Sequence, residues 1–225
     1  MRSCVKPLLL INPNTNAATT EEMARIARYA APPALVVEGV TARRGAALIH
    51  DEELLAISAS AVVELAGTLD LARYCGIIVA AFGDPGLDRL REFSPVPVTG
   101  IAEAGIMEAA GKGRRFSVVT ITPDLVAAIR KRVEAYGYGD RFTGVRLTQG
   151  DAVSAMGDPG RLEESLAEAC ALAISEDKAE AIIIGGGPLA RHAAALAPRF
   201  DVPIIEPVPA AIRLALARAE SRPPG

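Results

Sequence analysis

Tryptophan is absent from this 225-residue sequence, and aromatic residues make up only 4% of it. A core rich in large aromatic side chains is therefore excluded, and the interior must be built from Ala, Leu, Ile and Val. Hydrophobic residues still account for 50% of the chain, a share that excludes intrinsic disorder. A chain of this length forms one large domain or two half-sized lobes.

Clustered positive charge is also missing. The formal net charge is −3, whereas a nucleic-acid partner requires clustered Lys and Arg side chains to neutralise its phosphates. The longest basic runs, residues 43–44 and 112–115, are accompanied by no stacking aromatic residue other than Phe116. We interpret these runs as solvated loop charges and expect no nucleic-acid partner.

The sequence has no apolar run of the roughly 18 residues that indicate a transmembrane helix, so we expect no membrane partner. The run Leu8–Ile11 is too short for the core of a signal peptide. Asn12-Pro13-Asn14 follows it in place of a small-residue cleavage site. We predict a buried strand there.

Cysteine is scarce, with three residues at positions 4, 75 and 170. Their separation excludes a disulfide framework and provides no metal-ligand spacing, so we expect no metal site and a reducing, cytoplasmic location. We interpret all three as small apolar residues and not as nucleophiles. A nucleotide motif is missing as well, because Gly185-Gly186-Gly187-Pro188 lacks both GxGxxG spacing and a Walker lysine.

What the sequence does contain is an alternation of short apolar runs with longer helix-forming segments. Continuous apolar runs are typical of parallel strands covered on both faces, so we predict an α/β fold with doubly wound parallel sheets. The predicted strands are Leu8–Ile11, Leu35–Val40, Gly76–Ala80, Val96–Thr99, Phe116–Thr120, Val145–Leu147, Ala181–Ile184 and Val202–Ile205. Predicted helices span Glu52–Leu69, Leu125–Tyr136, Leu162–Ile174, Leu189–Leu196 and Pro209–Ala219. Thr19 and Thr20 are predicted to cap a first helix, and Asp51 a second.

Three strand-and-turn signals recur in the same order about 105 to 110 residues later. Residues 10–13 resemble residues 120–123, residues 77–81 resemble residues 182–186, and residues 96–98 resemble residues 202–204. The repeat predicts two pseudo-symmetric α/β lobes with an inter-lobe cleft. Residues 1–100 plus 205–225 are assigned to the first lobe and residues 101–204 to the second. No Gly/Ser- or Pro-rich linker separates them, so we expect tight packing.

Ligands of open α/β sheets bind beyond the carboxyl ends of the strands. Two facing lobes bring four such ends, residues 12–15, 81–86, 120–123 and 185–188, to one cleft. Amide, hydroxyl and backbone N–H groups there predict a small-molecule carboxylate, ureide or imide as ligand. The candidate substrate-binding residues are Asn12, Asn14, Thr15, Ala81, Phe82, Gly83, Thr120, Thr122, Gly186, Gly187 and Pro188.

Three titratable residues are candidate catalytic groups. Asp84 follows Phe82-Gly83 and precedes Pro85, where it serves either as a base or, since Asp-Pro commonly starts a turn, as a structural residue. Glu206 ends the last predicted strand, where an acid can face the cleft. His50 is the third candidate. A lone histidine is most often structural or exposed, which applies to His192 as well.

Five strings together resemble the hydantoin and allantoin racemase branch of the Asp/Glu racemase superfamily: Ile11–Thr15, Phe82–Leu87, Gly100–Ala104, Ser117–Thr120 and Val202–Ile205. They occur in the same order over nearly the whole chain. The resemblance implies two flavodoxin-like lobes related by a pseudo-dyad, no cofactor, and a site in the inter-lobe cleft. It also favours a homo-oligomer, which the composition neither supports nor opposes.

Typical members of that branch use two facing cysteines, one in each lobe, to remove and return a proton at a carbon beside a carbonyl. The resemblance places Ala81 and Gly186 at these two positions. A methyl group and a hydrogen atom carry no proton. Cys75 cannot substitute, because six residues of strand separate it from position 81 by about 20 Å. We therefore expect two-thiol racemisation to be absent.

Three hypotheses remain open. The first is a cofactor-independent enzyme that acts on a small ureide, hydantoin or amino-acid-like substrate by non-cysteine chemistry, as an isomerase-like enzyme, a lyase or a hydrolase. The second is a non-catalytic ligand-binding homologue. The third is a racemase whose cysteines were engineered out to trap a ligand.

Overall fold

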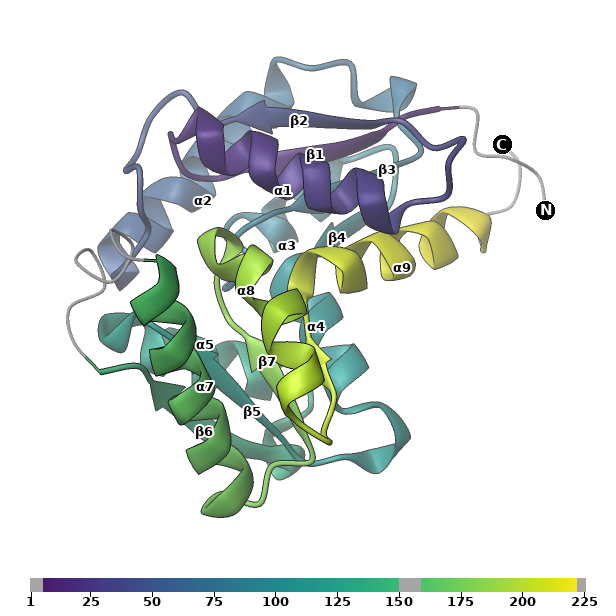
Figure 1. Cartoon of the computed structure of the whole chain (residues 1–225). Helices are drawn as coiled ribbons and strands as arrows, with labels where there is room; N and C mark the ends of the chain where they lie inside the picture. Colours follow the sequence, from purple (N-terminus) through teal and green to yellow (C-terminus); the bar gives the residue numbers. More distant parts are fainter. Residues whose placement is uncertain (1–5, 150–158, 222–225) are drawn as a thin grey trace.

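The computed structural model describes residues 6–149 and 159–221, which form two four-stranded parallel sheets (Figure 1). The first sheet has the order β2-β1-β3-β4, with β1 at Leu8–Asn12, β2 at Val37–Thr41, β3 at Gly76–Val79 and β4 at Val98–Gly100. The second has the order β6-β5-β7-β8, with β5 at Phe116–Thr120, β6 at Phe142–Leu147, β7 at Ala181–Ile184 and β8 at Ile204–Ile205.

Helices connect the strands of each sheet. In the first half they are α1 (Ala17–Ala30), α2 (Glu52–Gly67), α3 (Leu87–Phe93) and α4 (Ile101–Ala109). In the second half they are α5 (Val126–Ala135), α7 (Pro159–Ser175), α8 (Ala190–Leu196) and α9 (Pro207–Glu220). Short 3₁₀ turns precede α5 at Pro123–Leu125 and α8 at Gly187–Leu189. No helix in the described ranges is long and apolar enough to cross a membrane.

The two sheets repeat one topology. β1 pairs in parallel with β2 and β3, and β5 pairs in parallel with β6 and β7. This shared strand order, with the first strand of each half inside its sheet, is that of flavodoxin-like folds. The predicted fold class, two pseudo-symmetric parallel-sheet lobes, is confirmed.

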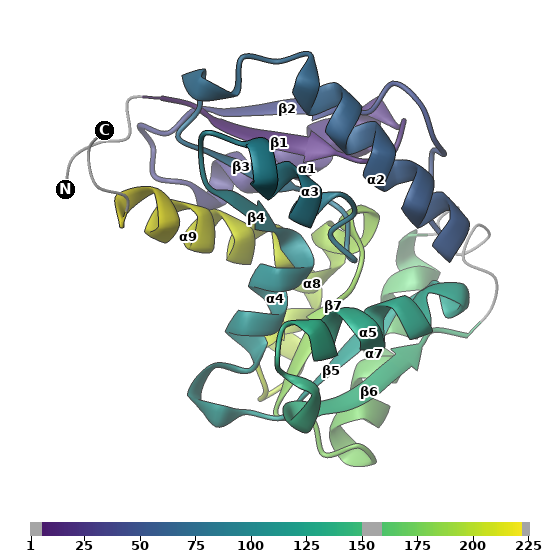
Figure 2. The ribbon, with the colours of Figure 1, turned by 180° about the vertical axis from the view of Figure 1, so that it is seen from behind.

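Each inner strand is buried on both faces, which explains its continuous apolar sequence. Leu9 and Ile11 of β1 pack in a cluster with α2 and α3, whereas Leu8 and Leu10 pack on the opposite face with α1 and α9. Figures 1 and 2 show these two helix pairs from opposite sides. The alternation follows from the two-residue period of a strand.

The helices α4 and α9 join the lobes. α4 begins directly after β4 and packs against both α9 and β7, and α9 returns from β8 to lie along α1, β3 and β4 (Figure 1). One cluster of buried apolar side chains therefore runs from the first sheet through these helices into the second. That residues 205–225 belong with the first lobe stays a proposal, and Ile205 itself lies in β8 of the second sheet.

Two local predictions were wrong or incomplete. The N-cap of α1 is Asn16, whose side chain accepts hydrogen bonds from the N–H groups of Ala18 and Thr19, so the threonines lie inside the helix. Asp51 does cap α2, accepting from the N–H of Leu54 at 2.7 Å. The helices α3 and α4 are short and were not predicted, because so few turns produce little periodic signal.

Candidate active site

A pocket opens where the carboxyl ends of β1, β3, β5 and β7 meet. It contains about 570 Å³ of space between atoms, including solvent at its mouth. Both Ala81 and Gly186 line it, one from each lobe. Its described lining residues are Asn14, Leu48, Ile49, Ala80, Ala81, Phe82, Thr120, Ile121, Thr122, Leu125, Ile129, Gly185, Gly186, Gly187 and Leu189.

The hydrogen bonds of Asn14 determine which end of its amide faces the pocket. Its Oδ1 accepts from Asn12 Nδ2 at 2.7 Å and from the N–H of Asn16 at 2.9 Å. Its Nδ2 makes no hydrogen bond within the described chain and is the group left for a ligand. Asn12 is fully buried and does not line the pocket, so its contribution is to hold Asn14 in this orientation.

The hydroxyls of Thr120 and Thr122 form a chain with a defined direction. Thr120 Oγ1 donates its only proton to the carbonyl of Gly185 at 2.8 Å. In the 3.1 Å contact between the two hydroxyls, Thr122 is therefore the donor. The oxygen of Thr122 keeps unused lone pairs, so this side of the pocket presents a hydrogen-bond acceptor.

The backbone at Gly186 has a conformation that L side chains rarely adopt, with φ at 146°. A Cβ built there would touch Leu189 at 3.4 Å, which is tight but not a collision. Backbone strain, more than space, therefore opposes any side chain at this position.

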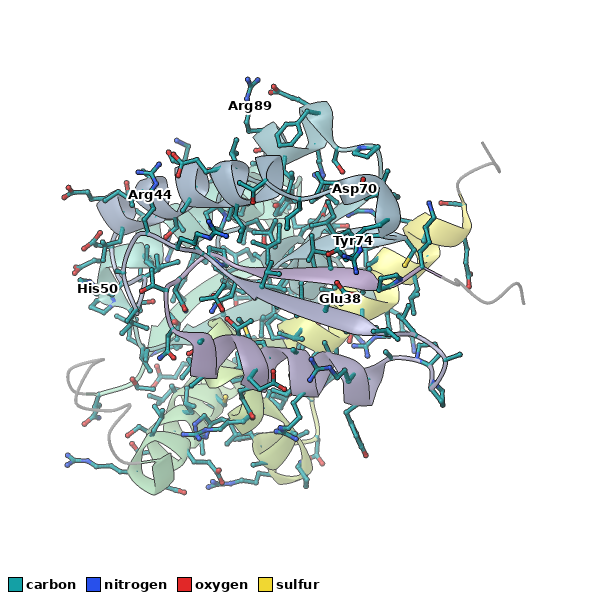
Figure 3. The ribbon with its side chains drawn as sticks, turned by 90° about the horizontal axis from the view of Figure 1, so that it is seen from above. Glu38, Arg44, His50, Asp70, Tyr74 and Arg89 are labelled. Atoms are coloured by element: carbon teal, nitrogen blue, oxygen red, sulfur yellow. The ribbon has the colours of Figure 1, made fainter. Side chains whose placement is uncertain are left out.

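None of the three candidate catalytic residues is among the residues that line the pocket. His50 is exposed, with Nδ1 at 3.3 Å from Asp51 Oδ2, and Figure 3 shows it at the margin of the molecule. Glu206 is half-buried at the start of α9, where burial raises its pKa against the opposing effect of Arg213 and Arg25. The structure does not bring these groups together.

Asp84 is completely buried, and its carboxylate is held by backbone N–H groups of α4 and by Tyr136. Burial raises its pKa to about 6, although these hydrogen bonds and the charge of Arg132 act in the opposite direction. Its oxygens are turned to the protein and not to the pocket, a placement that favours the structural interpretation of this residue.

Besides Asn12, two further candidate binding residues, Thr15 and Gly83, are not among the described lining residues. The N–H of Thr15 donates to the carbonyl of Ala46 at 3.0 Å and so holds the loop after β2. Gly83 lies one residue beyond the pocket-lining Phe82, and Pro188 belongs to the 3₁₀ turn that follows β7. Asn14, Ala81, Phe82, Thr120, Thr122, Gly186 and Gly187 do line the pocket.

The described cysteines do not line the pocket either. Cys75 is half-buried just before β3, and Cys170 is buried in α7, where desolvation raises its thiol pKa to about 12. Cys4 lies outside the described residues. His192 is buried on α8, next to Arg191 Nε at 3.2 Å, and burial lowers its pKa. No lining residue in the described ranges has a titratable side chain.

The apolar wall of the pocket was missed by sequence reasoning. Leu48 and Ile49 come from the loop between β2 and α2, and Leu125 and Ile129 come from the turn before α5 and from α5 itself. The available signal in the sequence was the pair Leu48-Ile49 just before the Asp51 cap. Large apolar residues in a loop are usually buried, so this pair indicated that the loop packs against another part of the chain.

The comparisons with known proteins agree with this geometry. The family described as Asp/Glu/Hydantoin racemase matches residues 8–215. A hydantoin racemase from Paenarthrobacter aurescens is 32% identical over 211 residues, covering 92% of this chain and 89% of the relative. The crystal structure of an allantoin racemase from Pseudomonas fluorescens has a TM-score of 0.89 at 32% identity, covering 94% of this chain and 89% of that one.

An allantoin racemase from Klebsiella pneumoniae is similarly close, with a TM-score of 0.88 at 32% identity over 94% of this chain and 86% of that chain. The match spans both lobes and all four strand ends that form the pocket. This chain therefore belongs to the Asp/Glu/hydantoin racemase family and, within it, to the hydantoin and allantoin racemase branch.

Proposed function

We propose that this chain is a cofactor-independent enzyme that acts on a small cyclic ureide, most simply a 5-substituted hydantoin, without a pair of thiols. The observation that carries the proposal is the pocket's polar set: an amide donor at Asn14, a hydroxyl acceptor at Thr122, and no titratable lining group among the described residues.

The polar set matches the edge of a ureide ring. A carbonyl oxygen of the ring accepts from Asn14 Nδ2, and a neighbouring ring N–H donates to Thr122 Oγ1. A ligand displaces the water molecules that hydrogen-bond to Asn14 Nδ2 and Thr122 Oγ1, and it must replace both hydrogen bonds. A ligand with adjacent C=O and N–H groups does so. A simple carboxylate uses only the donor, and a simple amine uses only the acceptor.

The apolar wall favours an apolar substituent on that ring. Similar relatives include both hydantoin and allantoin racemases at 32% identity, so identity alone does not separate the two ligands. Allantoin bears a polar ureido group, whose N–H and C=O groups would lie unpaired against Leu48, Leu125 and Ile129. Each unpaired polar group costs about 1–3 kcal/mol, whereas an alkyl group gains from burial.

The proposed chemistry follows from what occupies the two family cysteine positions. Ala81 and Gly186 face the pocket and supply no acid or base. Asn14 Nδ2 stabilises negative charge on the ring carbonyl when the adjacent carbon loses a substituent or a proton. Any proton then moves to and from water. This leaves isomerase-like, lyase and hydrolase reactions as the reaction classes, all at rates below those of a two-thiol enzyme.

A second candidate is a ligand-binding homologue without catalysis, favoured by the absence of titratable groups among the described lining residues. The engineered-racemase alternative is weakened by the backbone at Gly186, since a cysteine in this conformation would be strained. We therefore regard the glycine as an adapted feature of the chain.

The test uses one enantiomer of 5-isopropylhydantoin in D₂O, with NMR following exchange and inversion at C5 and loss of the ring, and calorimetry measuring affinity. The Asn14→Ala variant is the control for pocket-dependent turnover. Turnover above that control and resistant to iodoacetamide supports the proposal. Binding without turnover supports the second candidate. Two outcomes contradict the proposal: turnover that alkylation abolishes, and a wild type that does not bind the hydantoin.

Placing cysteines at positions 81 and 186 distinguishes the engineered-racemase hypothesis from the other two. The double variant Ala81→Cys/Gly186→Cys is expected to fold less stably because of the strain at position 186. Strong racemisation by this variant, with none by the wild type, would identify the chain as a disabled racemase.

A further inference from the structure

The buried carboxylate of Asp84 lies at a junction that the proposed chemistry does not use. Its Oδ1 accepts from the N–H of Ala102 at 2.9 Å, and its Oδ2 accepts from the N–H of Glu103 at 2.8 Å. Both donors lie in the first turn of α4, where backbone N–H groups have no acceptor within the helix. Asp84 therefore caps the helix that joins the lobes. The loop after β3 is thereby attached to α4.

The fit between this loop and α4 is close. A Cβ at Gly100, the residue before α4, would lie 2.1 Å from Asp84 Cγ, so the carboxyl group occupies the space that any other residue would need. Asp84 itself adopts a left-handed conformation with φ at 50°. Such a conformation persists only where the surroundings hold it in place.

A third contact extends the junction into the second lobe. The hydroxyl of Tyr136, at the C-terminal end of α5, donates to Asp84 Oδ2 at 2.7 Å. Arg132, one turn earlier on α5, lies 3.3 Å from Asp88 Oδ2 on α3, but Asp88 is largely exposed and this pair is worth little. The Asp84–Tyr136 hydrogen bond is thus the strong polar link between the loop after β3 and α5.

Both elements linked in this way carry walls of the pocket. Asp84 follows the lining residues Ala81 and Phe82 in the same loop, and Tyr136 ends the helix that carries the lining residue Ile129. We propose that Asp84 and Tyr136 form a clasp that sets the width of the pocket by holding the β3 loop against α5. In this role both are positioning residues and neither touches the ligand.

The test is the Tyr136→Phe variant, which removes one hydroxyl and keeps the ring. The matched control is Tyr74→Phe, because Tyr74 donates a similar hydrogen bond to Glu38 Oε2 at 3.0 Å within the first lobe (Figure 3). Hydrogen exchange is measured on the ligand-free proteins. We expect amides of residues 81–86 and 123–130 to exchange about tenfold faster in Tyr136→Phe and unchanged in Tyr74→Phe.

Exchange in these two segments that is equal in Tyr136→Phe and wild type would overturn the clasp, as would equal acceleration in both variants. If Tyr136→Phe does not fold, amide hydrogen exchange is measured instead on the wild type, at denaturant concentrations below its unfolding transition. The clasp requires residues 81–86 and 123–130 to open together, and separate opening overturns it.

A second measurement links the clasp to binding and rests on the proposed function. The affinity for 5-isopropylhydantoin should fall about tenfold in Tyr136→Phe and remain unchanged in Tyr74→Phe, even where both lose similar stability. Unchanged affinity in Tyr136→Phe would contradict control of pocket width. If the wild type binds no hydantoin, the proposed function fails while the exchange measurement still decides the clasp.

Discussion

At the scale of single residues, we propose that the orientation of one amide decides what the pocket recognises. Asn14 Oδ1 is occupied by Asn12 and Asn16, so only Nδ2 faces a ligand. The pocket-facing group is therefore a donor, and a ligand must supply an acceptor opposite it. A reversed amide would select the opposite chemistry from the same sequence.

Asn14→Ala should weaken hydantoin binding by about 1–3 kcal/mol, because a buried carbonyl loses its donor. Asn14→Asp has nearly the same shape but presents an oxygen in place of Nδ2, so it should weaken binding at least as much. Calorimetry on both variants measures the effect. Wild-type affinity in Asn14→Asp would mean that the donor plays no part in binding.

Gly186→Ala should lower the free energy of unfolding by about 1–3 kcal/mol, because φ at 146° is strained for any L side chain. Gly67, at the end of α2, has nothing within 4 Å of a built Cβ, so Gly67→Ala is the control and should cost no stability. Denaturant unfolding compares the two. Equal values for both variants would show that Gly186 is not strained by a methyl group.

At the scale of secondary-structure elements, the N-terminus of α4 is a closely constrained junction. It receives Asp84 from one lobe, begins after the sterically required Gly100, and holds Glu103 between Arg91 and Arg218. Burial opposes ionisation of Glu103, but hydrogen bonds from the two arginines lower its pKa. α4 is thus tied by charge at its start and by apolar packing along its length.

The raised pKa of Asp84 predicts how stability depends on pH. Burial raises this pKa to about 6, against about 3.9 for an unfolded aspartate, while Tyr136 and Arg132 face the carboxylate and oppose the shift. The folded chain therefore holds this proton more tightly than the unfolded chain does. The resulting stabilisation is full below pH 3.9 and is lost as the pH rises through 6.

Between pH 5 and pH 7, wild type should lose about 1–2 kcal/mol of unfolding free energy relative to Asp84→Asn, which does not titrate. Urea unfolding of both proteins at the two pH values provides the comparison. A difference between them that is independent of pH would mean that Asp84 stays ionised throughout this range.

At the scale of the whole molecule, the pocket exists only because two similar lobes face each other across shared helices. Its described lining includes the ends of inner strands in both sheets, and one apolar core continues between them. A ligand in this pocket contacts both lobes at once. Binding should therefore stabilise the molecule as one unit and not one lobe alone.

A hydantoin at 100 times its dissociation constant should add about 2.7 kcal/mol to the free energy of unfolding. Because both lobes contribute contacts, thermal unfolding should remain a single transition with a higher melting temperature. Calorimetry of the ligand-bound protein measures this. Two transitions, of which only one moves, would place the ligand on a single lobe.

Much of the architecture could be predicted from sequence, because strand burial and internal repetition are local patterns. Seven predicted strands differ from the observed ones by at most two residues at either end, and the repeat anticipated two sheets with one topology. The largest difference is at the edge strand β6, which begins at Phe142, three residues before the predicted start. Edge strands are less buried, so their apolar signal is weaker.

The sequence by itself determined the fold class, the family, and the strand ends that meet at the pocket, since each depends on residues near one another in the chain or on motif strings. Only the tertiary structure decided that Leu48 and Ile129 share a wall, that Asn14 presents a donor, and that Asp84 turns away from the pocket toward Tyr136. These facts depend on contacts between distant segments and on the direction of hydrogen bonds, and neither is encoded in the local pattern of residues.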